Sequence, residues 1–328
     1  MGNRQRVARI ELSRRLNAIF GCRWIWWASA AKDAWVAVLE TVDIGLRDLV
    51  HVPVGAPEHL EHAILAAGSR PVAVDLDPVS GAPIWPQDLA SSRDTRTVCI
   101  LDHRLGRPVP PPRTSNGALV LEDTIGAVGG AVSGCAVGSL GRAAVTVLGA
   151  WPFDRTRGAL VSTDSAGVAA RLQAAGLVPL APEGPTRDGV AVAPWGALEA
   201  DAGDLDDRID ACRAAAGVYD SAFRPLGLPM SVVAPFPETS PTYSTYLVQT
   251  QDAGALIHAL ARKGIEARPV VPTRLSSTLA DPQTAWPGAK AFYSRAVALP
   301  CHPNLGLDEL LYVADAVRLH LQGLSARP

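Results

Sequence analysis

The sequence predicts an α/β protein with a large domain on a mostly parallel sheet and a small C-terminal α+β domain. Short runs rich in Val, Leu and Ile are apolar almost throughout, which is typical of strands buried on both faces. Helical segments lie between several of these runs, and this alternation favours an α/β fold. A stretch rich in Pro, Gly and small residues, 182–203, interrupts the pattern and marks the change of domain.

The elements of the large domain follow from these periodicities. Strands are predicted at 49–54, 71–76, 97–102, 118–123, 143–148 and 159–163. Helices are predicted at 34–41, 58–67 and 165–175, before or between the strands. The order of strands and helices is that of a parallel sheet covered by helices.

The small domain begins with a long helix predicted over 204–223. Asp204 is placed to cap this helix, and one of its faces carries Ile209, Cys212, Ala216 and Tyr219. Later elements are strands at 231–235, 243–250, 266–271 and 296–299, a helix at 252–263 ended by Gly264, and a helix from 307. The predicted division is an N-terminal segment 1–20, a large domain 21–203 and a small domain 204–328.

Composition excludes several classes of partner. The formal charge is −2 and the pI about 6.4, so neither nucleic acid nor an anionic membrane is indicated. Five scattered cysteines without framework spacing indicate a reducing compartment. The charged N-terminus lacks a signal-peptide core, and no apolar run reaches membrane-spanning length, so a soluble cytoplasmic protein is expected.

Several segments in order carry a family resemblance. They include GLRDLVHVPV (45–54), AILAAGSRPVAVDLDPVSGAPI (63–84), DHRLGRP (102–108), LVLEDTIGAVGG (119–130), RIDACRAAAGVYDSAF (208–223), LARKGIEARP (260–269) and AVALPCHPNLGLDEL (296–310). From about residue 15 to 322 the chain resembles the DegT/DnrJ/StrS family of aminotransferases dependent on pyridoxal phosphate (PLP). The resemblance implies the PLP-dependent aminotransferase fold of type I, with small sugar or antibiotic intermediates as substrates.

The resemblance fails at the cofactor positions. Members hold PLP as a Schiff base on a lysine amine, but this chain has only Lys32, Lys263 and Lys290, and Trp151 falls at or within a residue of the lysine position. An indole nitrogen is only a donor and forms no imine. We therefore expect no covalently held PLP and no other cofactor, while non-covalent binding of PLP stays open.

Other cofactor contacts of the family are also missing. The phosphate-binding Ser-Gly-Thr turn matches residues 30–32, where Lys32 and the helix N-terminus are left to attract an anion. No aromatic residue stands at 55–57, where the family stacks a ring on the cofactor, and Gly126 replaces its Gln or His. The Asn-Tyr-Arg segment that reaches the neighbouring subunit corresponds to about 191–193. Asp123 is retained as the match for the carboxylate that pairs with the pyridine nitrogen.

Asp123 and His103 are the candidate catalytic residues, each at the end of a strand. Asp123 is either a cap or a carboxylate aimed into the old cofactor pocket, and His103 is either a structural histidine or a general base. Trp151, Lys32, Trp27 and Gly126 are candidate ligand-pocket residues, with Trp151 expected to face the same region as the tryptophans near the start of the chain. These tryptophans can equally be core or interface residues. His59 and His62 are interpreted as part of a solvated face, and no metal site is predicted.

Three functions remain open at this level. The first is a repurposed, PLP-independent enzyme performing cyclisation, dehydration or condensation on a small intermediate of specialised metabolism. The second is a non-catalytic subunit that pairs with an intact aminotransferase paralogue. The third is an active aminotransferase that uses one of the three lysines. The resemblance implies a dimer in each case, with a second copy or with the paralogue.

Overall fold

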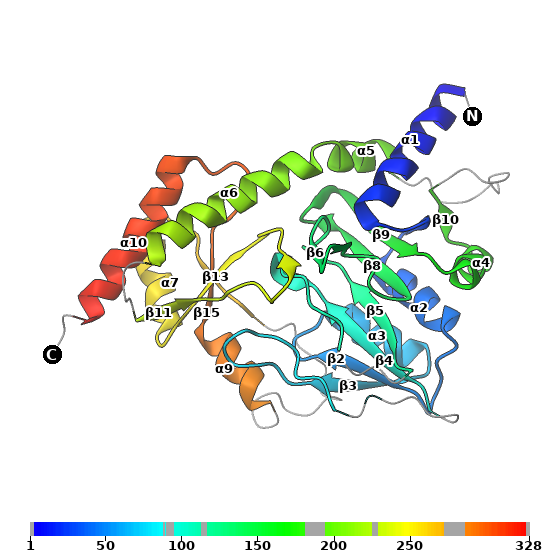
Figure 1. The fold of residues 1–328 in the computed structure, drawn as a ribbon, viewed down its shortest axis with the longest axis horizontal. Helices are drawn as coiled ribbons and strands as arrows, with labels where there is room; N and C mark the ends of the chain where they lie inside the picture. The colour runs from blue at the N-terminus through cyan, green and yellow to red at the C-terminus, as the bar shows by residue number, and fades with distance from the viewer. Residues whose placement is uncertain are drawn as a thin grey trace.

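The computed structural model describes the chain except residues 1–2, 88, 90–94, 113–116, 181–193, 225–228, 272–285 and 326–328. Its centre is an eight-stranded sheet in the order β10-β1-β9-β8-β5-β4-β2-β3 (Figure 1). The strands are β1 Trp24–Ala28, β2 Leu49–Pro53, β3 Arg70–Val74, β4 Thr97–Asp102, β5 Leu119–Asp123, β8 Ala143–Ala150, β9 Phe153–Thr163 and β10 Val178–Pro179. Strands β3, β2, β4, β5 and β8 are mutually parallel, whereas β9 is antiparallel to both neighbours.

Helices cover both faces of this sheet. One face packs on α2 Ala31–Thr41, α3 Glu58–Ala66 and α4 Ala166–Ala174, and the other packs on α1 Asn3–Phe20 and α5 Trp195–Gly203. Strand β1 shows why two cores form, because successive side chains point to opposite faces. Trp26 enters the first core, while Ile25 and Trp27 enter the second. The α/β architecture predicted from the apolar runs is confirmed, since these strands are buried on both sides.

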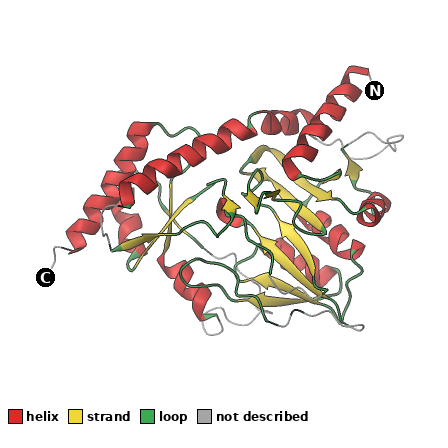
Figure 2. Ribbon diagram, viewed as in Figure 1, coloured by secondary structure: helices red, strands yellow, loops and turns green. Residues whose placement is uncertain are grey.

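Helix α6 Leu205–Phe223 runs from the large sheet to the C-terminal part of the chain (Figure 1). There it packs with α7 Ala253–Ala261 and α10 Leu307–Ser325 against a four-stranded antiparallel sheet (Figure 2). That sheet consists of β11 Met230–Val232, β13 Tyr246–Thr250, β15 Ala296–Leu299 and β14 Arg268–Pro269. Helix α9 Pro287–Arg295 precedes β15, and a three-stranded sheet joins β12 Thr239–Ser240 to β6 Ala131–Val132 and β7 Cys135–Ala136. The predicted boundary at 203/204 stays a prediction.

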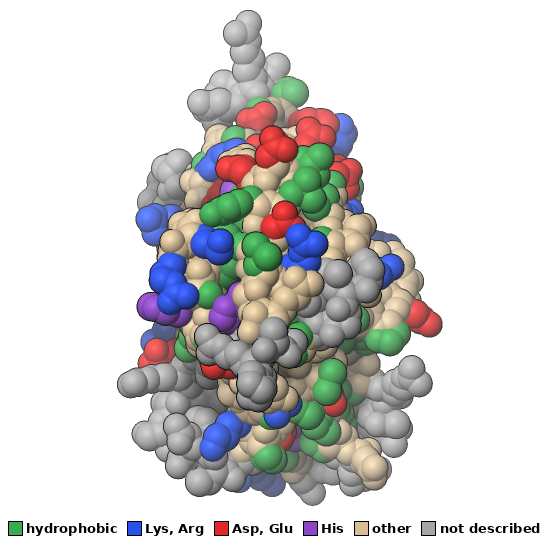
Figure 3. All heavy atoms as spheres, turned by 90° about the vertical axis from the view of Figure 1, so that its left-hand side faces the viewer, with side chains coloured by type: hydrophobic (Ala, Val, Ile, Leu, Met, Phe, Trp, Pro, Cys, Tyr) green, Lys and Arg blue, Asp and Glu red, His purple; other side chains and the backbone are tan. Residues whose placement is uncertain are grey.

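The outer face of α10 is mixed in character. Leu310, Val313 and Val317 point into the small-domain core, whereas Leu307 and Leu311 are among the exposed apolar residues. Acidic and apolar side chains are intermingled on the upper part of this end of the molecule (Figure 3). No helix in the described ranges has the length and apolar character required to cross a bilayer.

Two sequence expectations need correction. The helix α6 begins after Asp204, but that carboxylate makes no capping hydrogen bond. Instead it accepts from Arg155 at 2.8 Å and lies 3.7 Å from Arg208, because an ion pair with a guanidinium competes with the cap. The sequence also left α1, β1, α5 and α9 unassigned. Helix α1 was hidden because it buries Arg9 and Ser13 beside its apolar residues, which blurs the helical period.

A close contact across the large sheet gives a stability prediction. Gly158 in β9 has φ +105°, and a Cβ there would lie 2.4 Å from the carbonyl oxygen of Ala28. Gly158→Ala is therefore expected to lower the free energy of unfolding by about 3 kcal/mol, because the backbone of β1 or β9 must move to make room for the methyl group. Gly176→Ala is the matched control, since φ is +85° but no atom lies within 4 Å; it should cost about 1 kcal/mol. If urea unfolding shows the same loss of stability for both variants, the close approach of Gly158 to the Ala28 carbonyl oxygen is contradicted.

Candidate active site

The candidate site lies at the carboxyl ends of parallel strands, where α/β sheets usually bind ligands. Asp102 ends β4 and Asp123 ends β5, and the two residues are partners in the sheet register. His59 joins them from the first turn of α3, which follows β2. The fold thus collects two carboxylates and one imidazole from three neighbouring strand-to-loop junctions.

Asp123 is fully buried and only half satisfied. Its Oδ1 accepts a hydrogen bond from the Ile125 backbone nitrogen at 3.2 Å, the turn-capping contact expected at a strand end. Its Oδ2 has no hydrogen-bond partner and lies 3.9 Å from Nε2 of His59, which is also buried and without a hydrogen bond. The His59 side chain is nevertheless 28% exposed, so its exposure comes from the other ring atoms. The arrangement is a buried carboxylate behind a half-exposed imidazole.

Burial sets the protonation of this pair. Burial, followed by the negative charge of Asp102, raises the pKa of Asp123 from 3.8 to about 7, against the opposing effects of Ile125 and Arg104. Burial also lowers the pKa of His59 below 6.5, although the charge of Asp102 opposes this. Near neutral pH a proton can therefore reside on Asp123 while the His59 imidazole is neutral. Such perturbed pairs at a strand edge are typical of functional sites.

Arg104 connects this pair to the small domain. Its guanidinium forms an ion pair with Asp102 and donates to the carbonyl oxygen of Gly55. Tyr293 of α9 interacts with Arg104 and donates its hydroxyl to the Val54 carbonyl oxygen at 2.9 Å. Arg104 and Tyr293 therefore tie the end of β2, the end of β4 and helix α9 together beside the site.

His103 follows Asp102 in the chain, but its side chain has other partners. It is fully buried, its Nδ1 accepts from the Val109 backbone nitrogen at 2.8 Å, and its Nε2 lies 3.2 Å from Oε2 of Glu122. Glu122 also accepts from the backbone nitrogens of Gly138 and Gly141 at 2.8 and 2.9 Å. Both ring nitrogens of His103 thus have partners within the protein, which favours the interpretation as a structural histidine over that as a general base.

Two of the predicted ligand-pocket residues, Trp27 and Trp151, pack into the same hydrophobic cluster. Trp151 lies in the turn between β8 and β9 with the Arg208 guanidinium 4.5 Å above its ring. Trp27 is buried in the core beneath α1 and donates its indole N–H to the Arg157 carbonyl oxygen at 3.2 Å. Trp151 therefore shares a region with Trp27 but not with Trp26, because strand alternation sends Trp26 to the opposite face of the sheet.

Lys32 and Gly126 are the other two predicted ligand-pocket residues, and they differ in exposure. Lys32 is exposed in the first turn of α2, whose N-cap Ala30 supplies no side-chain hydrogen bond. Gly126 is buried with φ +81°, and its carbonyl oxygen accepts from the Thr242 hydroxyl at 2.7 Å. Gly126 therefore joins the β5 loop to the segment before β13. The family segment matched to 191–193 lies outside the described residues.

His59 is the residue that the sequence interpretation missed. The neighbouring Glu58 and Glu61 suggested a solvated helix face, but Glu61 is only 2% exposed and His59 is half-buried. The sequence did contain a signal for His59, because it lies at the start of a helix that follows a parallel strand. That turn faces the edge of the sheet where ligands bind. Within the described ranges no group of three His, Cys, Asp or Glu side chains is arranged to hold a metal ion.

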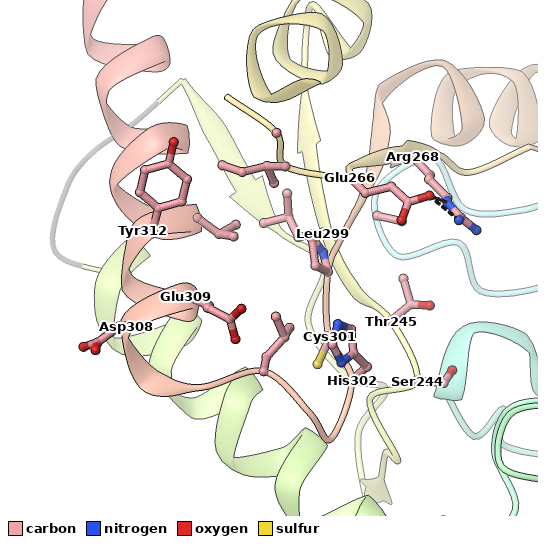
Figure 4. A pocket seen from close by; sticks show the side chains of 16 residues that line it. Ser244, Thr245, Glu266, Arg268, Leu299, Cys301, His302, Asp308, Glu309 and Tyr312 are labelled. Carbon is pink, nitrogen blue, oxygen red and sulfur yellow. Dashed lines mark hydrogen bonds and ion pairs between the residues drawn. The ribbon is translucent and has the colours of Figure 1, made fainter. Parts of the chain in front are cut away.

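Two hollows are relevant to function. The larger, about 650 Å³, lies in the small domain, where Glu309 and Tyr312 come from α10 and His302 follows β15 (Figure 4). Two of its polar groups are already paired, since Glu309 accepts from the Gly306 nitrogen and Tyr312 donates to the Lys263 carbonyl oxygen. The smaller, about 160 Å³, is lined by residues from the ends of β2 and β4 and from α9, and includes Asp102 and Arg104. Only the smaller hollow shares residues with the candidate site.

Comparisons with known proteins concern the sequence of residues 200–318 and the overall fold. Residues 200–318 match the model of the DegT/DnrJ/EryC1/StrS aminotransferase family. No curated protein is detectably similar in sequence. Among solved structures, a DegT DnrJ EryC1 StrS aminotransferase from Brucella abortus superposes with a TM-score of 0.78 at 19% identity, covering 98% of this chain and 91% of that one.

Two further structures are similar over nearly their whole length. DesV of S. venezuelae, solved with a ketimine intermediate, gives a TM-score of 0.78 at 22% identity and covers 98% of this chain and 90% of its own. The PMP-form of the putative sugar aminotransferase Spr1654 from Streptococcus pneumoniae gives 0.79 at 19% identity, covering 98% and 92%. The chain therefore has the fold of these aminotransferases, and its residues 200–318 match the DegT/DnrJ/EryC1/StrS family model.

Proposed function

We propose that this protein is an enzyme of sugar or specialised-metabolite biosynthesis that uses an aminotransferase scaffold without a lysine-bound PLP. The scaffold and the substrate class are supported by the similar structures, which include sugar aminotransferases and PseC of Helicobacter pylori, an aminotransferase of pseudoaminic acid biosynthesis. The departure from PLP chemistry is supported by this chain's own residues.

The residues present do not fit a covalently held PLP. The family resemblance puts the Schiff-base lysine at the β8–β9 turn, where this chain has Trp151 covered by Arg208. Lys32 is exposed at the start of α2, and Lys263 and Lys290 are exposed on the small-domain side. No lysine occurs from residue 33 to 262, so a shift of alignment does not supply one. We therefore derive no step through this cofactor.

The observation that carries the proposal is the contact between Asp123 and His59. In the resembling enzymes the carboxylate at Asp123 pairs with the pyridine nitrogen of the cofactor. Here the free oxygen of that carboxylate faces an imidazole nitrogen at 3.9 Å instead. With a proton on the buried Asp123 carboxyl, the half-exposed His59 imidazole is neutral near pH 7 and can act as a base. His59 would then exchange a proton with the substrate at its exposed edge, which serves a cyclisation, dehydration or condensation.

The proposal is tested by adding PLP to the purified protein. We expect no saturable absorption band at the visible edge, and no stoichiometric pyridoxyl adduct in the intact mass after borohydride reduction. Because exposed lysines react slowly with free PLP, Lys263→Arg and Lys290→Arg variants are reduced in parallel as controls. A stoichiometric adduct that maps to one lysine would overturn the proposal.

A second candidate is an active sugar aminotransferase. It is favoured by the fold match to structures solved in PLP and PMP forms. It requires a lysine near Asp123, and Lys32, at the helix start that the family uses for the cofactor phosphate, would be the residue to examine. If the reduced adduct maps to Lys32 and disappears in Lys32→Arg, this candidate replaces the first.

A further inference from the structure

A cavity of about 160 Å³ lies between the large sheet and the small domain. Asp102, Arg104 and Arg107 line it from the large domain, and Val271 and Tyr293 line it from the other side. A water molecule occupies about 30 Å³ of liquid, so the cavity has room for roughly five waters or a molecule of a few carbon atoms. The cavity shares the Asp102–Arg104 ion pair with the candidate site, so a ligand held here would lie beside it.

Arg107 is a buried cation without a counter-ion. The residue is only 8% exposed. Its two terminal nitrogens donate to the backbone carbonyl oxygens of Ser80 and Ala234, both at 2.7 Å, and its guanidinium lies 4.3 Å above the ring of Phe236. Its Nε has no partner, and in the described part of the chain Arg107 forms no ion pair with a carboxylate. Burial lowers the pKa of Arg107 to about 10, so it remains charged at neutral pH.

The charges around the cavity do not balance. Arg104 is neutralised by its ion pair with Asp102, whereas among the described residues the charge of Arg107 is offset by two carbonyl dipoles and the Phe236 ring. A buried charge without a counter-ion is unfavourable, and a bound anion would offset that penalty and so stabilise the folded state. One uncompensated positive charge matches a monoanion, and the planar fork of arginine matches the two oxygens of a carboxylate.

We propose that this cavity binds the carboxylate group of a small molecule through Arg107. The assignment of that molecule as a substrate rests on the function proposed above. Asp102 lines the cavity and is the register partner of Asp123, so a molecule held in the cavity would lie beside the Asp123–His59 pair. The site is therefore specific for acidic metabolites of a few carbon atoms rather than for neutral sugars alone.

The test is a calorimetric titration of the full chain with lactate, propane-1,2-diol and inorganic phosphate. Lactate should bind the wild-type protein, whereas propane-1,2-diol, which has the same carbon skeleton without the carboxylate, should not. Arg107→Gln should weaken lactate binding about tenfold or more, because a charge-assisted pair is lost. Arg262→Gln, which removes an exposed arginine far from the cavity lining, should bind lactate as the wild type does.

Val271→Trp keeps the test decisive if Arg107→Gln fails to fold. Val271 lines the cavity and is 68% exposed, so an indole there would occupy the cavity without touching the bonds of Arg107. It should weaken lactate binding to a similar extent. No lactate binding to the wild type, or unchanged binding in both variants, would overturn the proposal. Phosphate binding that exceeds lactate binding and is lost in Arg107→Gln would overturn the carboxylate assignment.

The experiment is independent of the test of function. A PLP adduct on a lysine would refute the PLP-free enzyme but leave lactate binding at Arg107 intact. Absence of lactate binding would refute the carboxylate site but leave the PLP result unchanged. The two failures are therefore distinguishable.

Discussion

Asp123→Asn is expected to stabilise the protein at pH 8.5 by on the order of 4 kcal/mol. The folded protein raises the pKa of Asp123 from 3.8 to about 7, so the ionised carboxylate is disfavoured in the fold by that difference. Asparagine has the same shape, and its oxygen can still accept from the Ile125 nitrogen, but it carries no charge. A side chain that destabilises its own protein is typical of a functional site.

The sign of the pH dependence follows from the raised pKa. The folded state binds the Asp123 proton more tightly than the unfolded chain does. The contribution of Asp123 to the free energy of unfolding is therefore fully present below about pH 3.8. It is lost as the pH rises through about 7, where the carboxyl ionises in the folded state. The gain from Asp123→Asn should thus be near its maximum at pH 8.5 and much smaller at pH 5.

Urea unfolding at pH 8.5, 7 and 5 measures this effect. Asp33→Asn is the control, because it removes an equal charge at an exposed position in α2 and should change stability by less than about 1 kcal/mol. If Asp123→Asn is less stable than the wild type at pH 8.5, or if its gain does not depend on pH, the carboxylate is paired by a contact other than those described.

Glu122→Ala is expected to abolish folding or to lower the free energy of unfolding by about 4 kcal/mol or more. The Glu122 carboxylate is fully buried and accepts from the Gly138 and Gly141 nitrogens and from Nε2 of His103. The proton of His103 lies on Nε2, because Nδ1 accepts from the Val109 nitrogen. Alanine would leave three buried donors unpaired at about 1–3 kcal/mol each, a large share of the total stability of a domain.

Two variants separate this effect from simple loss of a charge. Glu122→Gln retains one acceptor oxygen and should lose less stability than Glu122→Ala. Glu199→Ala, at an exposed position of α5, should change the free energy of unfolding by no more than about 0.5 kcal/mol. Soluble expression, circular dichroism and urea unfolding give the measurement. A Glu122→Ala protein of nearly wild-type stability would show that water satisfies these donors.

Strands were predictable from the sequence where both faces are buried. The runs at β4 and β15 were assigned with the observed bounds, because a strand buried on both sides needs apolar residues at every position. Helices with one apolar face, such as α6, were predictable because their apolar residues recur with the period of an α-helix. Helices α5 and α9 were not, since Gly, Pro and small residues around them carry no clear period.

The sequence by itself determined the fold class and which chemistry-bearing residues exist, including the absence of lysine between residues 33 and 262. It also singled out Asp123, because a carboxylate at the end of a buried strand reaches the ligand edge of a parallel sheet. Only the tertiary structure decided the partners of these groups. His59 faces Asp123, Glu122 pairs with His103, and Asp204 forms ion pairs with arginines. Arg107 is buried with no carboxylate partner among the residues that the structure describes. These outcomes depend on contacts between segments far apart in the chain, and burial and charge pairing are properties of that three-dimensional arrangement rather than of local periodicity.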